Sequence, residues 1–268
     1  MLLAFVVTTL AGLATVVGGV LGTNARMLRR DVLAAGLAFA AGLMITISVV
    51  EIAPAAQDAL REQTGSVAEG LLWVGGAMVL GALVVVAVDL AIPAQEVHEA
   101  GGGVHLERAS RGEIDPELLR SGVLLAVVVG LHNLPEGLAT FVSTLKQPSG
   151  GITLALAIAI HNVPEGLAVA APIYAATRSK MQAIFWATIS GLAEPLGALV
   201  GYLMLRALLP PQWLELSLAL VAGMMLAVSF RELLPAARRY ETHYSQSLVG
   251  FFLGAVVMVL SLQLLAAG

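Results

Sequence analysis

An eight-residue motif occurs twice in this chain of 268 residues, as HNLPEGLA at 132–139 and as HNVPEGLA at 161–168. In a helix, the histidine and the glutamate of each copy are i,i+4 neighbours that share one face, and the asparagine lies three residues before the same glutamate. Each glutamate could therefore bridge two adjacent positions, one served by histidine and one by asparagine. Imidazole, carboxylate and amide oxygen together suit zinc and other first-row divalent ions. The motif thus gives six candidate metal ligands: His132, Asn133, Glu136, His161, Asn162 and Glu165.

Each copy also carries a proline directly before its glutamate, Pro135 and Pro164. Proline has no N–H and disrupts the helical hydrogen bond to the carbonyl four residues earlier, here that of Leu131 or Ile160. The freed carbonyl oxygens are further candidate ligands, and a kinked helix leaves room for an ion. A proton path and purely structural polar packing use similar residues, so both stay as alternatives. The duplication of the whole set favours coordination of a divalent metal.

The composition places these motifs in an integral membrane protein. Hydrophobic residues make up 58% of the chain, charged residues 12%, and the mean hydropathy is +0.89. A soluble domain is about 45–50% apolar even when glycine is included, and about 25% charged. These values exclude a disordered chain, a nucleic-acid-binding protein and a cytosolic enzyme. The absence of cysteine excludes disulfides, thiolate metal sites and thiol catalysis.

A spanning helix needs about 20 predominantly apolar residues, and eight stretches of the chain meet this requirement. They are predicted at about 2–22, 32–52, 70–92, 121–144, 151–174, 181–208, 213–235 and 247–267. The stretches are too long for transmembrane strands and do not alternate between apolar and polar residues. We therefore expect an all-α membrane protein with a single transport domain, residues 1–268. Residues 54–69 are one of its polar separators, and residues 93–120 form a flexible cytoplasmic loop.

Basic residues prefer the cytoplasmic ends of membrane helices. If the N-terminus lies outside, 11 of the 14 Lys and Arg residues fall on the inner side and 3 on the outer side. Eight crossings then place both termini outside. At about 1.5 Å per residue, His132 and His161 lie near the middle of a core roughly 30 Å thick. Glu194, followed by a proline in the 181–208 helix, lies at a similar depth. It is a seventh candidate ligand, although a buried glutamate could merely bond a serine or the backbone.

A second repeat relates the two halves of the chain. Residues 40–56 align without gaps to 221–237 and match at eight of 17 positions, including Glu51 with Glu232. In the predicted topology the members of each repeat run in opposite directions. Inverted-topology repeats place binding sites at the membrane midplane, on interrupted helices. Alternating access requires such symmetry, whereas enzymes rarely do.

Transport is therefore the leading interpretation, with an intramembrane zinc-dependent hydrolase as the main alternative. A metal-sensing or structural membrane protein without flux is the third. The sequence contains no HExxH motif, which would have supported a zinc-dependent hydrolase. Several other polar residues are candidate pathway residues, each of which could equally be a solvated residue at a helix end or in a loop. They are Glu51, Glu232, Asp89, His98 and His105. Met44, Met224 and Met225 are expected to pack rather than to bind metal.

The two motifs, followed by GLAEPLGA at 191–198, resemble helices 4, 5 and 6 of the ZIP (Zrt-/Irt-like) family of metal transporters. The prokaryotic branch with His-Asn in both helices is the most similar, and the segments at 39–54 and 223–235 resemble its helices 2 and 7. The resemblance implies an eight-helix uptake transporter, not an enzyme, that moves divalent metal from outside to the cytoplasm. It also implies a site for two metals. The first metal would use His132, Glu136, His161 and Glu165. The second would use Asn133, Glu136, Asn162, Glu165 and Glu194.

The resemblance further implies what the protein handles and where it resides. Zinc is the first expected substrate, followed by iron, manganese, cobalt and cadmium, and no organic cofactor is expected. The chain is expected in the inner (plasma) membrane of a bacterium. Its predicted partners are metal ions and the lipid bilayer, with a homodimer as a candidate assembly and no nucleic acid.

Overall fold

The computed structural model describes residues 1–24, 29–91, 116–208 and 212–266. In this part of the chain, every element is helical. The elements are α1 (Leu2–Leu21), α2 (Arg30–Ile47), η1 (Ser48–Ile52), α3 (Ala53–Thr64), α4 (Val67–Ala91), α6 (Pro116–Lys146), α7 (Pro148–Thr177), α8 (Lys180–Leu208), α9 (Gln212–Val228), η2 (Ser229–Leu233), α10 (Leu234–Tyr240) and α11 (Ser245–Ala266). The described residues contain eight helices long and apolar enough to cross a membrane. The prediction of an all-α protein with eight spanning helices is confirmed.

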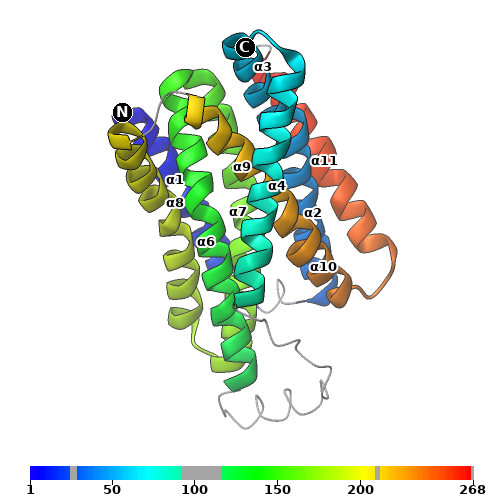
Figure 1. Ribbon diagram of the computed structural model, residues 1–268. Coiled ribbons are helices and arrows are strands. Elements are labelled where there is room, and N and C mark those ends of the chain that lie inside the picture. The colour runs from blue at the N-terminus through cyan, green and yellow to red at the C-terminus, as the bar shows by residue number, and fades with distance from the viewer. Residues whose placement is uncertain (25–28, 92–115, 209–211, 267–268) are drawn as a thin grey trace.

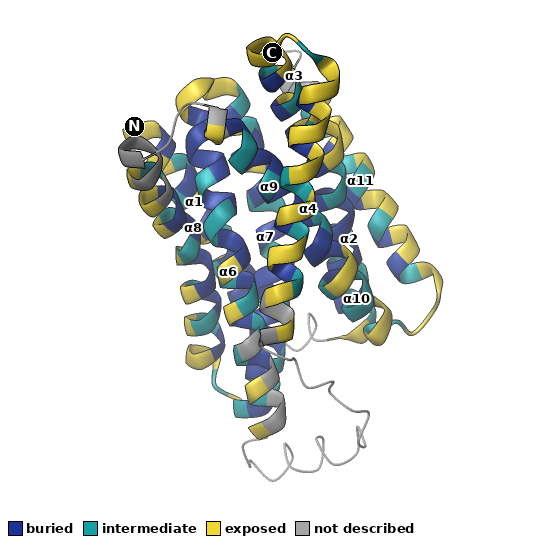
Figure 2. Cartoon of the chain, in the orientation of Figure 1, coloured by how far each residue is buried: buried dark blue, intermediate teal, exposed yellow. Residues whose placement is uncertain are grey.

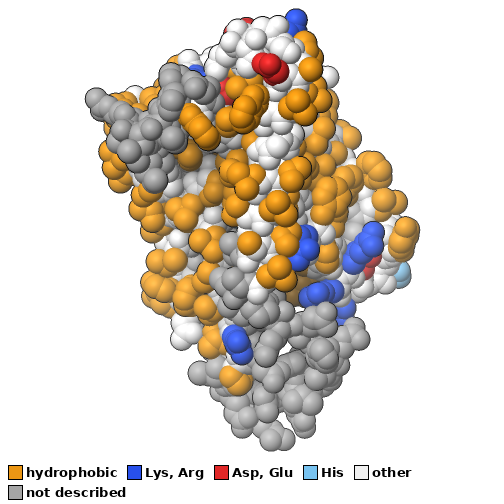
Figure 3. Space-filling model, in the orientation of Figure 1, with side chains coloured by type: hydrophobic (Ala, Val, Ile, Leu, Met, Phe, Trp, Pro, Cys, Tyr) orange, Lys and Arg blue, Asp and Glu red, His pale blue; other side chains and the backbone are white. Residues whose placement is uncertain are grey.

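The helices form one elongated bundle, and both termini lie at the same end of it (Figure 1). The outward faces of the peripheral helices are exposed, and α7 runs through the buried interior (Figure 2). Figure 3 shows that hydrophobic side chains cover the flank of the bundle, while Lys and Arg side chains gather toward the end away from the termini. Leu2 and Leu72 are 80% and 76% exposed. Because so many large apolar side chains would be unfavourable in water, this flank suits lipid.

The second and seventh spanning helices each contain one π-helical turn. In the second, η1 joins α2 to α3, so that the helix continues through Pro54 to Thr64 and ends at Gly65, where φ is +71°. Most of the polar separator expected at 54–69 is therefore helical. Pro54 is tolerated because it follows the π turn, where the ordinary i→i−4 bond that a proline would disrupt is replaced. Pro235 occupies the same position after η2.

The helix packing has an approximate two-fold symmetry. The first three spanning helices make the same kinds of contact as the last three. Helix α1 packs along α7 as α8 packs along α6, and α2 packs along α11 as α9 packs along α4. Two pairs of symmetry-related helices also pack against each other, α6 with α7 and α1 with α8. In Figure 1, α3 lies at the end that carries the termini and its counterpart α10 lies toward the opposite end. The arrangement is that of an inverted repeat.

Reciprocal glycines set the closest helix crossings. A Cβ added to Gly137 of α6 would collide with the carbonyl oxygen of Glu194 in α8, and one added to Gly197 of α8 would collide with that of Leu134 in α6. Three further helix pairs cross in the same way. Small residues allow backbones to approach this closely within a membrane. The four glycine pairs are Gly137 with Gly197, Gly18 with Gly166, Gly42 with Gly254, and Gly81 with Gly223.

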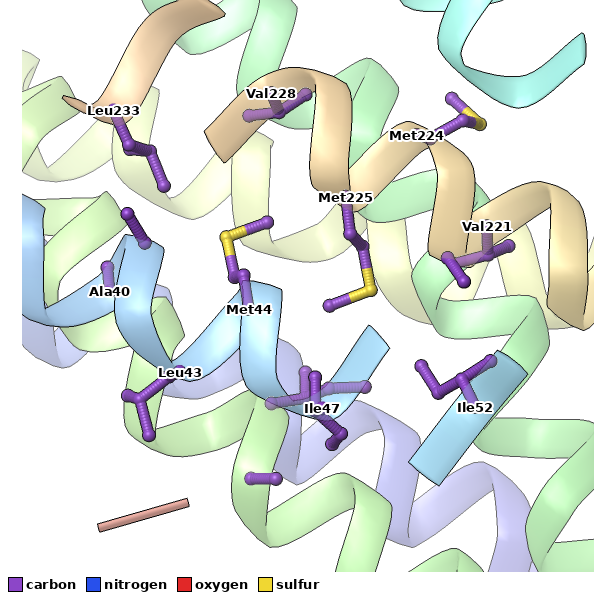
Figure 4. Packing of buried hydrophobic residues seen from close by; sticks show 14 of the residues in the cluster. Ala40, Leu43, Met44, Ile47, Ile52, Val221, Met224, Met225, Val228 and Leu233 are labelled. Atoms are coloured by element: carbon purple, nitrogen blue, oxygen red, sulfur yellow. The ribbon is translucent and has the colours of Figure 1, made fainter. Parts of the chain in front are cut away.

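The largest hydrophobic cluster lies between α2, α7 and α9 and is contacted by other helices. Met44 of α2 and Met225 of α9, which the sequence repeat aligns, extend into the space between these two helices (Figure 4). Both side chains are fully buried within this cluster. The two methionines therefore fill apolar volume in the core between α2 and α9 (Figure 4).

Candidate metal-binding site

All seven predicted ligands lie in the interior of three neighbouring helices. Helix α6 carries the first motif, α7 the second, and α8 carries Glu194. Each helix continues on both sides of its proline, Pro135, Pro164 or Pro195. The exposed fraction of every one of these side chains is 3% or less: His132, Asn133, Glu136, His161, Asn162, Glu165 and Glu194. So many polar groups inside an apolar bundle are costly unless they face one another, water or an ion.

Glu136 lies between the two histidines. Its Oε1 is 2.9 Å from Nε2 of His161 on α7, and its Oε2 is 3.8 Å from Nε2 of His132 on its own helix. The contact within α6 follows from the i,i+4 spacing that the motif predicts. The contact between α6 and α7 depends on how closely these two helices pack, and it joins the two copies of the motif.

The two asparagines are oriented by equivalent backbone contacts. Asn133 donates from Nδ2 to the carbonyl oxygen of Ser190 on α8, at 3.0 Å. Asn162 donates from Nδ2 to the carbonyl oxygen of Ala11 on α1, at 2.9 Å, and also to Oε1 of Glu194. Because each amide nitrogen is directed at a neighbouring helix, each Oδ1 is left for another partner. Both Oδ1 atoms are buried and accept no hydrogen bond from any described residue.

Glu165 and Glu194 bring two further carboxylates into the same region. Glu165 is within electrostatic range of Glu136 and His161, and Glu194 is within range of Glu136 and Glu165. Several of the buried oxygen and nitrogen atoms have no hydrogen-bond partner in the described part of the chain. They are His132 Nδ1, Asn133 Oδ1, Glu136 Oε2, Asn162 Oδ1, Glu165 Oε2 and Glu194 Oε2. Such a concentration of unsatisfied acceptors is unusual in a protein interior and calls for a cationic or hydrated occupant.

The side chains as they stand are not arranged as a complete coordination shell. Among the described residues, no group of three or more His, Asp or Glu side chains is placed to hold a metal ion. Glu136 is turned toward His161, and Glu194 is turned toward Asn162. The structure thus brings the predicted ligands into one buried region without showing their coordination geometry.

The predicted pathway residues lie in different surroundings. Glu232 and His132 line one small cavity of about 30 Å³ between α4, α6, α9 and η2. This volume is enough for one or two water molecules. Glu51, the counterpart of Glu232 in η1, is exposed. Asp89 belongs to α4, but the placement of its side chain falls outside the described part, as do His98 and His105 altogether.

Sequence reasoning missed two hydroxyl groups near the motifs, those of Thr15 and Ser190. Both side chains are almost fully buried, and neither hydroxyl has a hydrogen-bond partner among the described residues. One signal could have identified this region. Residues 11–18, AGLATVVG, match 190–197, SGLAEPLG, at four of eight positions. This alignment relates α1 to α8 as the octapeptides relate α6 to α7.

Eight apolar helices around a buried set of carboxylate, imidazole and amide groups define a multi-pass membrane protein with a polar site at its centre. Comparison with known families identifies the family of this protein. The model of the ZIP zinc transporter family matches residues 94–262. The chain belongs to this family. Since its members are transporters, the intramembrane hydrolase that the sequence left as an alternative is not supported.

Three bacterial relatives, each named zinc transporter ZupT, match the chain over almost its whole length. The protein of Chlorobaculum parvum is 43% identical over 98% of this chain and 97% of its own length. That of Corynebacterium glutamicum is 43% identical over 98% and 99%, respectively. That of Oceanobacillus iheyensis is 44% identical over 99% of both chains. The similarity therefore covers all eight spanning helices.

Proposed function

We propose that this protein takes up divalent transition-metal ions, zinc first among them, from outside the cell into the cytoplasm through the buried site on α6, α7 and α8. One observation carries the proposal: the two HNxPEG motifs and Glu194 place a set of buried acceptors without hydrogen-bond partners among the described residues in the core of the bundle. The relatives are named zinc transporters, which supports zinc as the first ion to test. Iron, manganese, cobalt and cadmium are further candidate substrates.

In this proposal the ion has two adjacent positions that share the carboxylates of Glu136 and Glu165. The first position uses imidazole nitrogens and suits zinc. The second uses amide and carboxylate oxygens and suits harder ions. The 2.9 Å approach of Glu136 to His161 supports the sharing, because it brings a carboxylate of α6 to a ligand of α7. The proposed ligands are His132, Glu136, His161 and Glu165 for the first position, and Asn133, Glu136, Asn162, Glu165 and Glu194 for the second.

The inward route runs from His132 toward Glu232. The support for this step is the cavity that both residues line, together with the position of Glu232 within the π turn η2 of its spanning helix, which continues to Tyr240. Glu51 is proposed as the corresponding residue on the outer side. Asp89, His98 and His105 stay predictions for the cytoplasmic side. The distribution of basic residues supports an orientation with both termini outside, and the bacterial relatives support the inner membrane.

The test is metal accumulation in proteoliposomes made with the purified full chain. A trapped fluorescent indicator reports the entry of zinc, iron, manganese, cobalt or cadmium, each with and without a pH gradient. We expect zinc entry above that of protein-free liposomes, with magnesium as a non-transported control. Metal binding without entry into the liposomes would instead identify a sensor or a structural protein. Assembly into a homodimer stays a prediction, which cross-linking in the intact membrane tests.

A further inference from the structure

Thr15 of α1 differs from the other buried threonines of the described residues. The hydroxyls of Thr8, Thr140 and Thr144 each donate to the carbonyl oxygen four residues earlier on their own helix. This is the usual way for a hydroxyl to be satisfied inside a membrane helix. The Thr15 side chain is fully buried, yet its Oγ1 has no hydrogen-bond partner in the described portion of the protein. A buried hydroxyl without a partner is costly, so it indicates a missing occupant.

The reason lies in the site itself. The carbonyl four residues before Thr15 is that of Ala11, and this oxygen already accepts the Nδ2 amide of Asn162 at 2.9 Å. Asn162 thereby occupies the acceptor that Thr15 would ordinarily use. The same bond fixes the side chain of a proposed metal ligand. Orientation of the ligand and release of the threonine hydroxyl are therefore two results of one contact.

Thr15 is also the two-fold counterpart of Glu194. A Cβ added to Gly166 of the second motif would collide with the Thr15 carbonyl, as one added to Gly137 of the first motif would collide with that of Glu194. The Cβ of Thr15 lies 3.0 Å from a Cβ built on Gly191, and that of Glu194 lies 3.2 Å from one built on Gly12. The local alignment of 11–18 with 190–197 pairs the same two residues. Thr15 thus has the same relation to α7 that Glu194 has to α6.

We infer that the Thr15 hydroxyl is a further oxygen donor to the transported ion, placed opposite Glu194 across the two-fold axis. The inference rests on the proposed function and deepens it by adding a ligand on α1. Its consequence is an asymmetric site, with a carboxylate on the α8 side and a neutral hydroxyl on the α1 side. A neutral donor adds an oxygen ligand without adding charge, so the ion is held less tightly than between two carboxylates. Release of the ion is correspondingly easier.

The experiment compares the full-length protein with Thr15→Val and Thr15→Ser in the proteoliposome assay. Valine keeps the β-branched shape and removes the hydroxyl, whereas serine keeps the hydroxyl. Thr8→Val is the matched control, because Thr8 is equally buried on the same helix but donates to the Ala4 carbonyl. We expect Thr15→Val to raise the half-saturating zinc concentration about three- to tenfold, the range for one neutral hydrogen-bonding group. Thr15→Ser and Thr8→Val should stay near wild type.

A second variant tests contact between residue 15 and the ion through a gain of cadmium binding instead of a loss of zinc binding. Thr15→Cys puts a soft sulfur at the same place in a chain that has no other cysteine. Soft ligands favour soft ions, so cadmium should compete more strongly with zinc in Thr15→Cys than in wild type. Thr8→Cys should leave the competition unchanged. This comparison remains informative if Thr15→Val does not insert into the membrane.

Zinc-induced thermal stabilisation of the detergent-solubilised protein gives a readout independent of transport. The inference is overturned if Thr15→Val matches Thr8→Val in half-saturation and in stabilisation by zinc, or if Thr15→Cys and Thr8→Cys show the same cadmium competition. If wild type fails to accumulate zinc but Thr15→Val still weakens stabilisation by zinc, the proposed transport is wrong and the assignment of Thr15 to the ion site stands.

Discussion

Glu136 of α6 and His161 of α7 meet across the helix interface, with Oε1 2.9 Å from Nε2. The two residues are 25 positions apart in the sequence and belong to different copies of the motif. Their contact joins the two copies of the motif in one buried polar cluster. Glu136 also approaches the other histidine, since its Oε2 lies 3.8 Å from Nε2 of His132.

The first prediction concerns the two motif carboxylates. Glu136→Ala and Glu165→Ala should each reduce zinc uptake by at least about tenfold, because even outer-shell partners of metal ligands are worth 10–100-fold. Each substitution removes negative charge that offsets a dication in an apolar interior. Uptake per inserted protein is the measurement. Glu62→Ala, on the exposed part of α3, is the control and should transport normally. Near-normal uptake by either motif variant would refute the shared-carboxylate site.

The second prediction concerns selectivity. Asn162→Ala removes an oxygen of the proposed second position and also frees Oε1 of Glu194. Since that position is the harder of the two, the ratio of manganese to zinc uptake should change more than the half-saturating zinc concentration does. Competition profiles among zinc, iron and manganese provide the measurement. Unchanged profiles would contradict a distinct oxygen-rich position.

The third prediction concerns the close crossing of α6 and α8 at Gly137. Gly137→Ala forces a methyl group against the Glu194 carbonyl, so it should destabilise the bundle by about 1–3 kcal/mol, as overpacking does. Gly76→Ala on α4 is the matched control, because nothing lies within 4 Å of a Cβ built there. This control should be neutral, or stabilising by up to about 1 kcal/mol through helix propensity. Thermal denaturation in detergent distinguishes the two. Equal stability of both variants would mean that the close crossing is absent.

The fourth prediction concerns the ion pair between Lys146, at the end of α6, and Glu215, near the start of α9. Glu215 is almost buried, whereas Lys146 is 42% exposed. Removal of the lysine leaves a desolvated carboxylate, so Lys146→Ala should cost about 1–3 kcal/mol. Glu215→Gln introduced in addition should restore part of this loss. Denaturation of the single and double variants gives the comparison, and a double variant less stable than Lys146→Ala would contradict the pairing.

The sequence determined the architecture of this protein because each membrane-spanning helix requires a continuous, predominantly apolar stretch, which can be recognised along the chain. Eight apolar stretches predicted the eight spanning helices, and the i,i+4 spacing of His132 and Glu136 predicted their shared face. The chemical types of the proposed ligands were also readable, since histidine, asparagine and glutamate occur together at two places. The family shown by the comparison is the ZIP family, which these motifs resemble.

Other features were not readable from the sequence, because they depend on backbone geometry or on neighbours that are distant in the chain. The π turns that carry the helices through Pro54 and Pro235 arise from local backbone geometry that the proline signal does not reveal. The approach of Glu136 to His161 depends on the distance between α6 and α7. The unsatisfied hydroxyl of Thr15 depends on Asn162, 147 positions further along, which occupies the carbonyl of Ala11. Spacing along a helix fixes which residues share a face, but only the packing of helices decides which faces meet and which hydrogen-bonding groups remain for an ion.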